Sequence, residues 1–108
     1  MLTVKDLIQI NKTLGEKGTP KDPKSGISGV LASHHYYDDT KEKVLSIAIS
    51  IAHGHPFENG NKRTALTIIR AFSDHYGWGL VSDDNQYKII QEIAAKGGKP
   101  SKYLKVFK

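Results

Sequence analysis

Apolar residues in this chain recur at intervals of three and four, the spacing of one face of an α-helix. Residues 3–14 predict a first amphipathic helix. The residues that share its apolar face are Val4, Leu7, Ile8 and Leu14. Thr3 is expected to cap the helix, and Asp6 stands at the reciprocal position of a capping box.

Two longer runs predict the centre of the fold. Residues 41–53 are apolar on almost every side, as is typical of a helix buried all round, and Thr40 is expected to cap it. After a loop at 54–60, residues 61–76 predict a second central helix. The side chains expected to face the core from it are Ala65, Leu66, Ile68, Ile69, Phe72 and Tyr76.

The remaining segments predict shorter elements. Residues 15–26 are rich in Gly, Pro and Lys and predict a loop, whereas residues 27–37 predict a short helix leading into an exposed flap. Ser82 is expected to cap a helix over 83–96, and residues 101–107 predict a last helical turn. The apolar residues of the 83–96 helix are Tyr87, Ile89, Ile90 and Ile93. The pattern therefore predicts an all-α fold.

Composition narrows the class of protein. A chain of 108 residues is large enough for one core, so residues 1–108 are expected to form a single domain. The absence of Cys excludes a disulfide scaffold and thiol chemistry. No apolar run is long enough to span a bilayer and no signal peptide opens the chain, so a cytoplasmic protein without a membrane partner is expected.

The net charge of +5 raises the question of an acidic partner. The lysines are scattered, with loose groups at residues 12–24 and 96–108, and no zinc-finger, helix-turn-helix or RNA-binding signature accompanies them. A solvated basic surface is therefore favoured over a nucleic-acid partner, and an acidic partner or a nucleotide remains the alternative.

The most polar segment lies between the two central helices, at residues 53–65. Pro56 disfavours the α region for His55 and should end the preceding helix. Gly60 permits turn geometry at the start of the next helix, where free backbone N–H groups attract anions. Lys62 and Arg63 place two positive charges in the first turn, where the helix dipole disfavours cations unless an anion is bound. These features predict a phosphate-binding loop beside a histidine.

Residues 55–63, His-Pro-Phe-Glu-Asn-Gly-Asn-Lys-Arg, resemble the signature of the Fic/Doc family. The stretch from Asn61 to Leu66, with Lys62 as its second residue and Thr64, Ala65 and Leu66 as its last three, is most similar to the Doc (death-on-curing) toxin branch. The resemblance extends more loosely over most of the chain. It implies a compact Fic/Doc-like helical bundle in which the motif loop lies between two central buried helices.

The resemblance also implies roles for the loop residues. His55 would be the general base, and Lys62 and Arg63 would stabilise charge during the reaction. The residues expected to hold the nucleotide phosphates are Asn59, Gly60, Asn61, Lys62 and Arg63. ATP would be the substrate and Mg²⁺ the cofactor.

Four other residues have open or secondary roles. Phe57 is interpreted as the anchor that holds the loop in the core. His34 and His35 are either flap residues that meet the nucleotide or target, or exposed polar residues without a role. His53 is expected to pack or hydrogen-bond at the helix end, rather than to bind zinc with His55.

The metal site departs from the family pattern. The family's acidic residue falls at Asn59, and an acid stands one place earlier, at Glu58. Mg²⁺ is usually held through carboxylates and substrate phosphates. Three interpretations follow: weaker metal binding at Asn59, transfer of the role to Glu58, or an inactive relative. Adjacent loop residues usually point in different directions, which favours weaker binding.

The resemblance implies two reactions. Most Fic enzymes transfer AMP from ATP to a protein hydroxyl, whereas the Doc branch transfers the terminal phosphate and inactivates elongation factor Tu. Lys62 in place of Gly, and Leu66 where AMP-transferring members carry a second Arg, favour phosphate transfer. AMP transfer is the alternative. A catalytically silent module that binds a nucleotide or partner is a further hypothesis, supported by Asn59 and the net charge.

Control of the activity can also be predicted from the resemblance. Many Fic enzymes are blocked by a helix with the pattern Ser/Thr, three residues, Glu, then Gly or Asn. The chain contains no such run. A separate antitoxin polypeptide is therefore expected, docking near the first helix and the flap.

Overall fold

The computed structural model describes residues 3–18, 29, 31 and 36–108. Named elements in this part of the chain are all helical, as predicted: α1 (Val4–Thr13), α3 (Thr40–Ala52), α4 (Asn61–Tyr76), α5 (Asp83–Lys96) and the 3₁₀ helix η2 (Pro100–Val106). Most of the predicted loop over 15–26, most of segment 27–37 with His34 and His35, and the side chain of Val4 lie outside the described residues.

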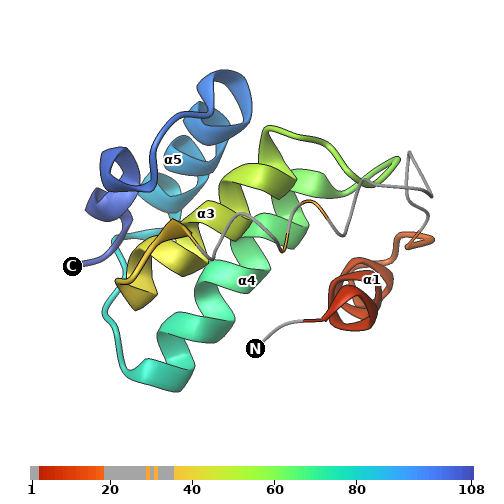
Figure 1. Cartoon of the computed structure of the whole chain (residues 1–108), viewed down its shortest axis with the longest axis horizontal. Helices are drawn as coiled ribbons and strands as arrows, with labels where there is room; N and C mark the ends of the chain where they lie inside the picture. The colour runs from red at the N-terminus through yellow and green to blue at the C-terminus, as the bar shows by residue number, and fades with distance from the viewer. Residues whose placement is uncertain (1–2, 19–28, 30, 32–35) are drawn as a thin grey trace.

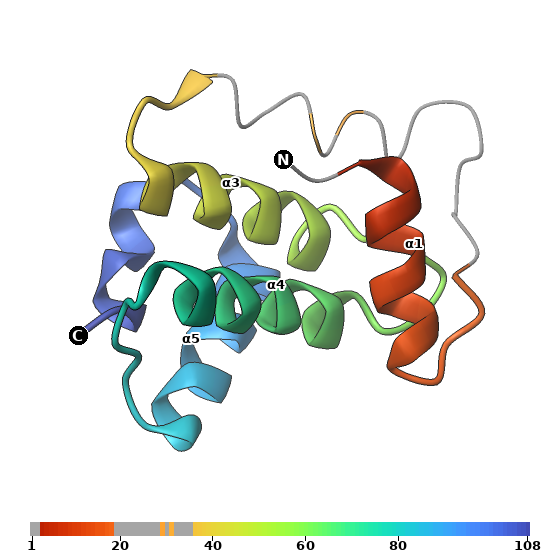
Figure 2. The same cartoon turned by 90° about the horizontal axis from the view of Figure 1, so that it is seen from below.

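Helices α3 and α4 form an antiparallel pair at the centre of the molecule (Figure 1). Figure 2 shows α1 crossing one end of this pair, next to the loop that joins α3 to α4. Helices α5 and η2 pack against α3 and against each other, and α5 also contacts α4. The motif loop therefore lies at the end of the central pair that α1 covers.

The core is centred on α3. Because α5, η2 and α4 all contact it, its apolar residues find partners on every side, as the sequence predicted. The side chains with no exposed surface in α3 are Val44, Leu45, Ile47, Ala48, Ile51 and Ala52. From α4, the predicted residues Ala65, Leu66, Ile68 and Ile69 are buried against them.

The helix starts follow local capping chemistry. Thr3 and Asp6 form the predicted capping box, with hydrogen bonds of 2.9 and 3.2 Å between each side chain and the other's backbone N–H. Ser82 caps α5 as predicted. The predicted cap of α3 was wrong by one residue: Asp39 accepts from the Glu42 N–H at 3.0 Å, and Thr40 is the first helical residue.

Two tyrosines of the predicted helices lie at the surface, and one of them, Tyr76, was predicted to face the core. Tyr76, in the last turn of α4, is 50% exposed and stacks on Trp78, with ring centroids 4.9 Å apart. Tyr87 of α5 is 51% exposed. Each ring is covered on one side, Tyr76 by Trp78 and Tyr87 by the Arg70 guanidinium, 5.5 Å from the ring centroid. A pattern of apolar residues does not distinguish such half burial from full burial.

The C-terminal segment is tied back to the α4–α5 connection. The Val81 N–H donates to the Val106 carbonyl at 3.0 Å, and the Lys108 N–H donates to the Gly79 carbonyl at 2.9 Å. Trp78 packs edge-on against Phe107 beside these bonds. None of the helices in the described part of the chain has the length and apolar content needed to cross a membrane.

Candidate active site

The loop after α3 turns sharply at two residues. A Cβ on Gly54 would lie 2.2 Å from the Ser50 carbonyl oxygen, so only glycine fits there. His55 has φ of +52°, in the left-handed region, and its N–H donates to the Ile51 carbonyl at 3.0 Å. Pro56 thus follows a residue outside the right-handed α region, as predicted. The turn leaves the His55 side chain exposed at the end of the central helix pair.

Phe57 and Asn61 hold the loop to the start of α4. Phe57 has no exposed surface. The Asn61 side chain accepts from the Phe57 N–H at 3.0 Å and donates to the Phe57 carbonyl at 2.9 Å. Since the Asn61 amide is buried and used in this way, contact of residue 61 with a phosphate would come from its backbone N–H.

The N-terminus of α4 offers backbone donors. Gly60, at φ +77°, is the N-cap residue of α4 and, being a glycine, has no side chain to accept hydrogen bonds from the first backbone N–H groups of the helix. The first bond of the helical ladder runs from the Thr64 N–H to the Gly60 carbonyl, at 2.9 Å. The N–H groups of residues 61–63 therefore precede the ladder and point out of the helix end, which suits an anion.

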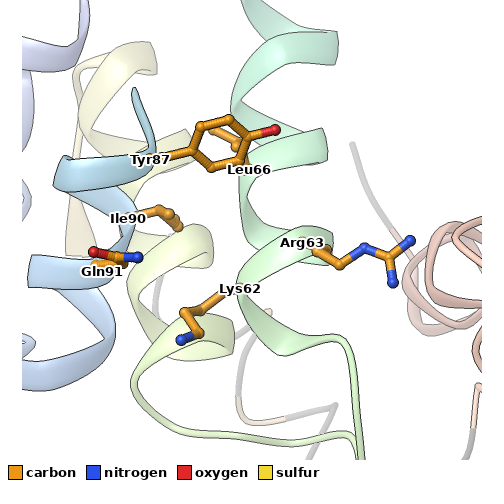
Figure 3. A pocket seen from close by; sticks show the side chains of 6 residues that line it. All are labelled: Lys62, Arg63, Leu66, Tyr87, Ile90 and Gln91. Atoms are coloured by element: carbon orange, nitrogen blue, oxygen red, sulfur yellow. The ribbon is translucent and has the colours of Figure 1, made fainter. Parts of the chain in front are cut away.

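The two cations of the first turn point to different sides, as Figure 3 shows. Arg63 extends toward α1: its Nη2 donates to the Leu14 carbonyl at 2.7 Å, and its Nη1 lies 3.6 Å from Glu16 Oε1. Lys62 extends toward α5 and makes no hydrogen bond or ion pair within the described residues. Glu16 thus neutralises one of the two charges that the helix dipole disfavours.

Lys62 borders a cavity of about 190 Å³ between α4 and α5 (Figure 3). Apolar side chains supply most of its walls, and the cations and an amide lie among them. The lining residues are Lys62, Arg63, Leu66, Tyr87, Ile90 and Gln91. The cavity therefore combines an apolar surface with positive charge at the N-terminus of α4.

A buried asparagine that sequence reasoning missed joins α1 to the loop. The Asn11 Nδ2 donates to the Asn59 carbonyl at 3.0 Å and to Thr64 Oγ1 at 3.1 Å, and its Oδ1 accepts from the Gly18 N–H at 2.9 Å. Its side chain is only 1% exposed. The signal was present in the sequence, because Asn11 follows Leu7 by four residues and so places an amide on the apolar face of α1.

The two candidate metal ligands border one cavity. It has a volume of about 150 Å³ and is lined by Asn11, Gly15, Glu16, Lys17, Glu58 and Asn59. Glu58 and Asn59 thus both contribute to the lining of this cavity, and Asn59 turns its backbone carbonyl toward Asn11 there. One carboxylate and one amide oxygen suit Mg²⁺ if substrate phosphates and water complete its coordination.

No group of three or more His, Cys, Asp or Glu side chains that could hold a metal occurs within the described ranges. His53 instead makes a hydrogen bond of 3.0 Å between its Nδ1 and the Ala94 carbonyl, which links the end of α3 to α5. This is the role expected of His53 at a helix end.

The comparisons with known proteins agree with this arrangement. A search of curated proteins found no match. The sequence model described as "Fic/DOC family" matches residues 1–73, which include α1, α3, the motif loop and most of α4. Members of this family are transferases that move nucleotide-derived groups to protein targets; they use ATP, usually with Mg²⁺, and are often paired with an antitoxin. With its motif loop between α3 and α4 and more than half of its length matched, the chain belongs to the Fic/DOC family.

Proposed function

We propose that this protein is a Doc-type toxin that transfers the terminal phosphate of ATP to a hydroxyl group of a protein target. The observation that carries the proposal is the end of the α3–α4 pair. The exposed His55 stands in the loop that leads into the N-terminus of α4. The backbone N–H groups of residues 61–63 lie there with Lys62, which has no hydrogen bond or ion pair within the described residues. These are a base and a set of anion-stabilising donors, the two requirements of phosphoryl transfer.

In the proposed reaction, His55 accepts the proton of the target hydroxyl. The freed oxygen attacks the terminal phosphorus, a new P–O bond forms, and the bond from that phosphorus to the bridging oxygen breaks to release ADP. Lys62, Arg63 and the N–H groups at the start of α4 stabilise the negative charge on the phosphate oxygens. Mg²⁺, when bound, neutralises charge on the phosphates, and Glu58 and Asn59 are the residues that would hold it.

Phosphate transfer is favoured over AMP transfer by residue 66. Leu66 lies in the first two turns of α4, is 4% exposed, and lines the cavity that Lys62 borders. The wall therefore carries an apolar side chain where AMP-transferring relatives place a second arginine. We propose that ATP is consequently held with its terminal phosphate, rather than its first phosphate, against the helix N-terminus.

Elongation factor Tu is the proposed target, and a separate antitoxin polypeptide the proposed regulator. The test is incubation of purified elongation factor Tu with this protein, Mg²⁺ and ATP labelled either on the terminal phosphate or on the first phosphate. Label carried over only from the terminal phosphate supports the proposal. Label from the first phosphate indicates AMP transfer instead. We expect His55→Ala to reduce transfer by about 10²–10⁴-fold.

A silent binding module is the second candidate, favoured by Asn59 in place of the family's acid. It predicts that ATP binds without a covalent product on any target. Binding of ATP that is unchanged in His55→Ala, together with no label on the target from either nucleotide, would support this candidate over the transferase.

A further inference from the structure

The C-terminal segment carries a lysine at every third residue. The four are Lys99, Lys102, Lys105 and Lys108, named the lysine stripe below. Lys102 and Lys105 lie within η2, and Lys99 and Lys108 flank it at the same interval. A 3₁₀ helix has three residues per turn, so side chains three apart project from the same face. Lys102 and Lys105 therefore share one face of η2, and Lys99 and Lys108 add a positive charge just before and just after it.

The same period buries a different face of η2. Pro100, Tyr103 and Val106 are also three apart, and all of them are buried. The Tyr103 hydroxyl donates to the Gly97 carbonyl within the core. Because this face is packed against α3 and α5, η2 cannot rotate, and all four lysines of the stripe remain exposed.

Most of the charge on the stripe is not neutralised. Of its four lysines, only Lys105 has an ion pair in the described part of the chain, with Glu92 at 3.2 Å. A further cation lies beside the end of η2: the Lys41 Nζ is 5.3 Å from the centroid of the Phe107 ring. A rigid line of exposed, largely unpaired cations produces a positive potential that attracts acidic surfaces.

The stripe begins close to the candidate active site. A Cβ on Gly97 would lie 2.8 Å from Cδ2 of His53, so the His53 ring packs on the turn that leads into η2. His53 precedes His55 by two residues, and Lys99 follows Gly97 by two. In Figure 1 the chain passes from the end of α5 to η2, which lies against α3. One end of a partner lying on the stripe, at Lys99, would therefore be near the turn that carries His53 and His55. The rest of the stripe follows η2 to the end of the α3–α4 pair opposite the motif loop (Figures 1 and 2).

We propose that the lysine stripe is a docking surface for an acidic segment of the protein substrate. This inference rests on the proposed function, because it assigns the docked partner as the protein that is modified. Charge complementarity supports that assignment, as does the position of Lys99, two residues after the glycine on which His53 packs.

A protein fits this surface better than a nucleic acid. Single-stranded nucleic acids are bound by cations together with exposed aromatic rings on which bases stack. The aromatic rings within the stripe segment, Tyr103 and Phe107, are both buried. The stripe contains Lys and no Arg, whereas Arg is the usual residue for phosphate recognition. Leu104, which is 36% exposed in the middle of the segment, offers an apolar contact that a protein surface can match.

The direct test measures binding of a fluorescent poly-glutamate peptide without ATP, so that the result does not depend on catalysis. The stripe variant combines Lys99→Gln, Lys102→Gln and Lys108→Gln. The control variant combines Lys5→Gln, Lys12→Gln and Lys88→Gln, three exposed lysines outside the stripe. Each variant removes three charges from the net charge of +5.

We expect the stripe variant to bind the peptide roughly tenfold more weakly than the wild type, with little change in the control. Equal weakening in both variants would mean that net charge alone attracts the peptide and would overturn the proposal. So would the absence of peptide binding by the wild type, or tighter binding of a single-stranded oligonucleotide of matched charge. All substitutions are at exposed positions, and urea unfolding checks that both variants fold.

A second measurement separates this proposal from the proposed function. In a transfer assay with labelled ATP, the stripe variant should raise KM for the protein substrate and leave kcat unchanged. Transfer with an unchanged KM would overturn docking on the stripe while leaving the proposed function in place. Stripe-dependent peptide binding by a protein that transfers nothing would contradict the proposed function alone.

Discussion

Arg63 of the motif is held by Glu16, from the segment that follows α1. The Arg63 Nη1 lies 3.6 Å from Glu16 Oε1, and the Arg63 Nη2 donates to the nearby Leu14 carbonyl at 2.7 Å. The Arg63 and Glu16 side chains are 59% and 26% exposed, so solvent weakens their attraction. A phosphate bound at the start of α4, as proposed, would therefore compete with Glu16 for Arg63 and would not be excluded by it. The contact arises although the chain lacks the inhibitory helix pattern of many relatives.

We expect Glu16→Gln to strengthen ATP binding. Removing the carboxylate leaves Arg63 free to meet a phosphate, and an exposed ion pair is worth about 0.2–1 kcal/mol, which corresponds to a gain of up to roughly fivefold. Isothermal titration calorimetry with ATP measures the change. Glu92→Gln is the matched control, since it removes an ion pair with Lys105 and the same charge. Equal gains in ATP affinity in both variants would show that the effect comes from net charge and not from the release of Arg63.

Asn61→Ala should loosen the loop. It leaves the buried Phe57 N–H and carbonyl without their side-chain partner, and an unpaired buried polar group costs about 1–3 kcal/mol. Urea unfolding should show a lower free energy of unfolding for this variant. Asn61→Asp should also destabilise the loop, because its carboxylate still accepts from the Phe57 N–H but places a second oxygen against the Phe57 carbonyl. Asn85→Ala, at an exposed position of α5, is expected to change little. A free energy of unfolding of Asn61→Ala equal to that of the wild type would contradict the role of the Asn61 side chain in holding the loop.

Asn59→Asp should reduce the Mg²⁺ concentration needed for half-maximal transfer. The substitution adds a third carboxylate to a cavity that Glu16 and Glu58 already line, and carboxylates hold Mg²⁺ more strongly than a neutral amide does. Binding of Mn²⁺ in the presence of ATP gives a readout that does not depend on turnover. Glu58→Gln distinguishes the two candidate ligands. If this variant loses more Mn²⁺ affinity than Asn59→Asp gains, the metal role is assigned to Glu58.

Tyr103 should make the fold sensitive to alkali. Burial raises the pKa of the Tyr103 hydroxyl above its usual value near 10, and the nearby Glu92 carboxylate adds to the rise. The unfolded chain therefore loses this proton at a lower pH than the folded protein does. The contribution of the neutral hydroxyl to the free energy of unfolding is complete below about pH 10 and is lost as the pH rises further. Thermal unfolding between neutral and alkaline pH measures the loss.

Tyr103→Phe provides the comparison. It gives up the hydrogen bond to the Gly97 carbonyl and so should be less stable than the wild type near neutral pH. Its stability should then fall less steeply in alkali, because no phenol remains to ionise. Parallel curves for the two proteins across this range would show that Tyr103 does not contribute to the alkaline loss.

Elements whose stability depends on local chemistry were predicted well. Helix α4 begins at Asn61 and ends at Tyr76, as expected from the glycines on either side of it. The capping box of Thr3 and Asp6 was visible from its spacing alone. The cap of α3 was misplaced by one residue, because Asp39 and Thr40 are both good capping residues and only the backbone conformation decides between them.

The candidate site was predicted less completely. The loop, its histidine and the anion-suited helix start follow from residues 53–63. The sequence does not indicate that the Asn61 side chain is used within the loop, or that Lys62 and Arg63 point to opposite sides. It also gave no reason to connect Glu16 with Arg63, which are far apart along the chain. These contacts depend on where α1 crosses the end of the central pair.

Sequence alone determined the helical class of this protein, the position of its motif between two apolar helices, and its resemblance to the Fic/DOC family. All three depend on residues close together in the chain, where periodicity, glycine and capping residues act locally. Tertiary structure alone decided which polar and charged side chains meet. Asn11, Glu16 and the lysine stripe acquire partners or remain free according to helix packing. Those contacts join residues distant in sequence, so no local pattern of residues specifies them.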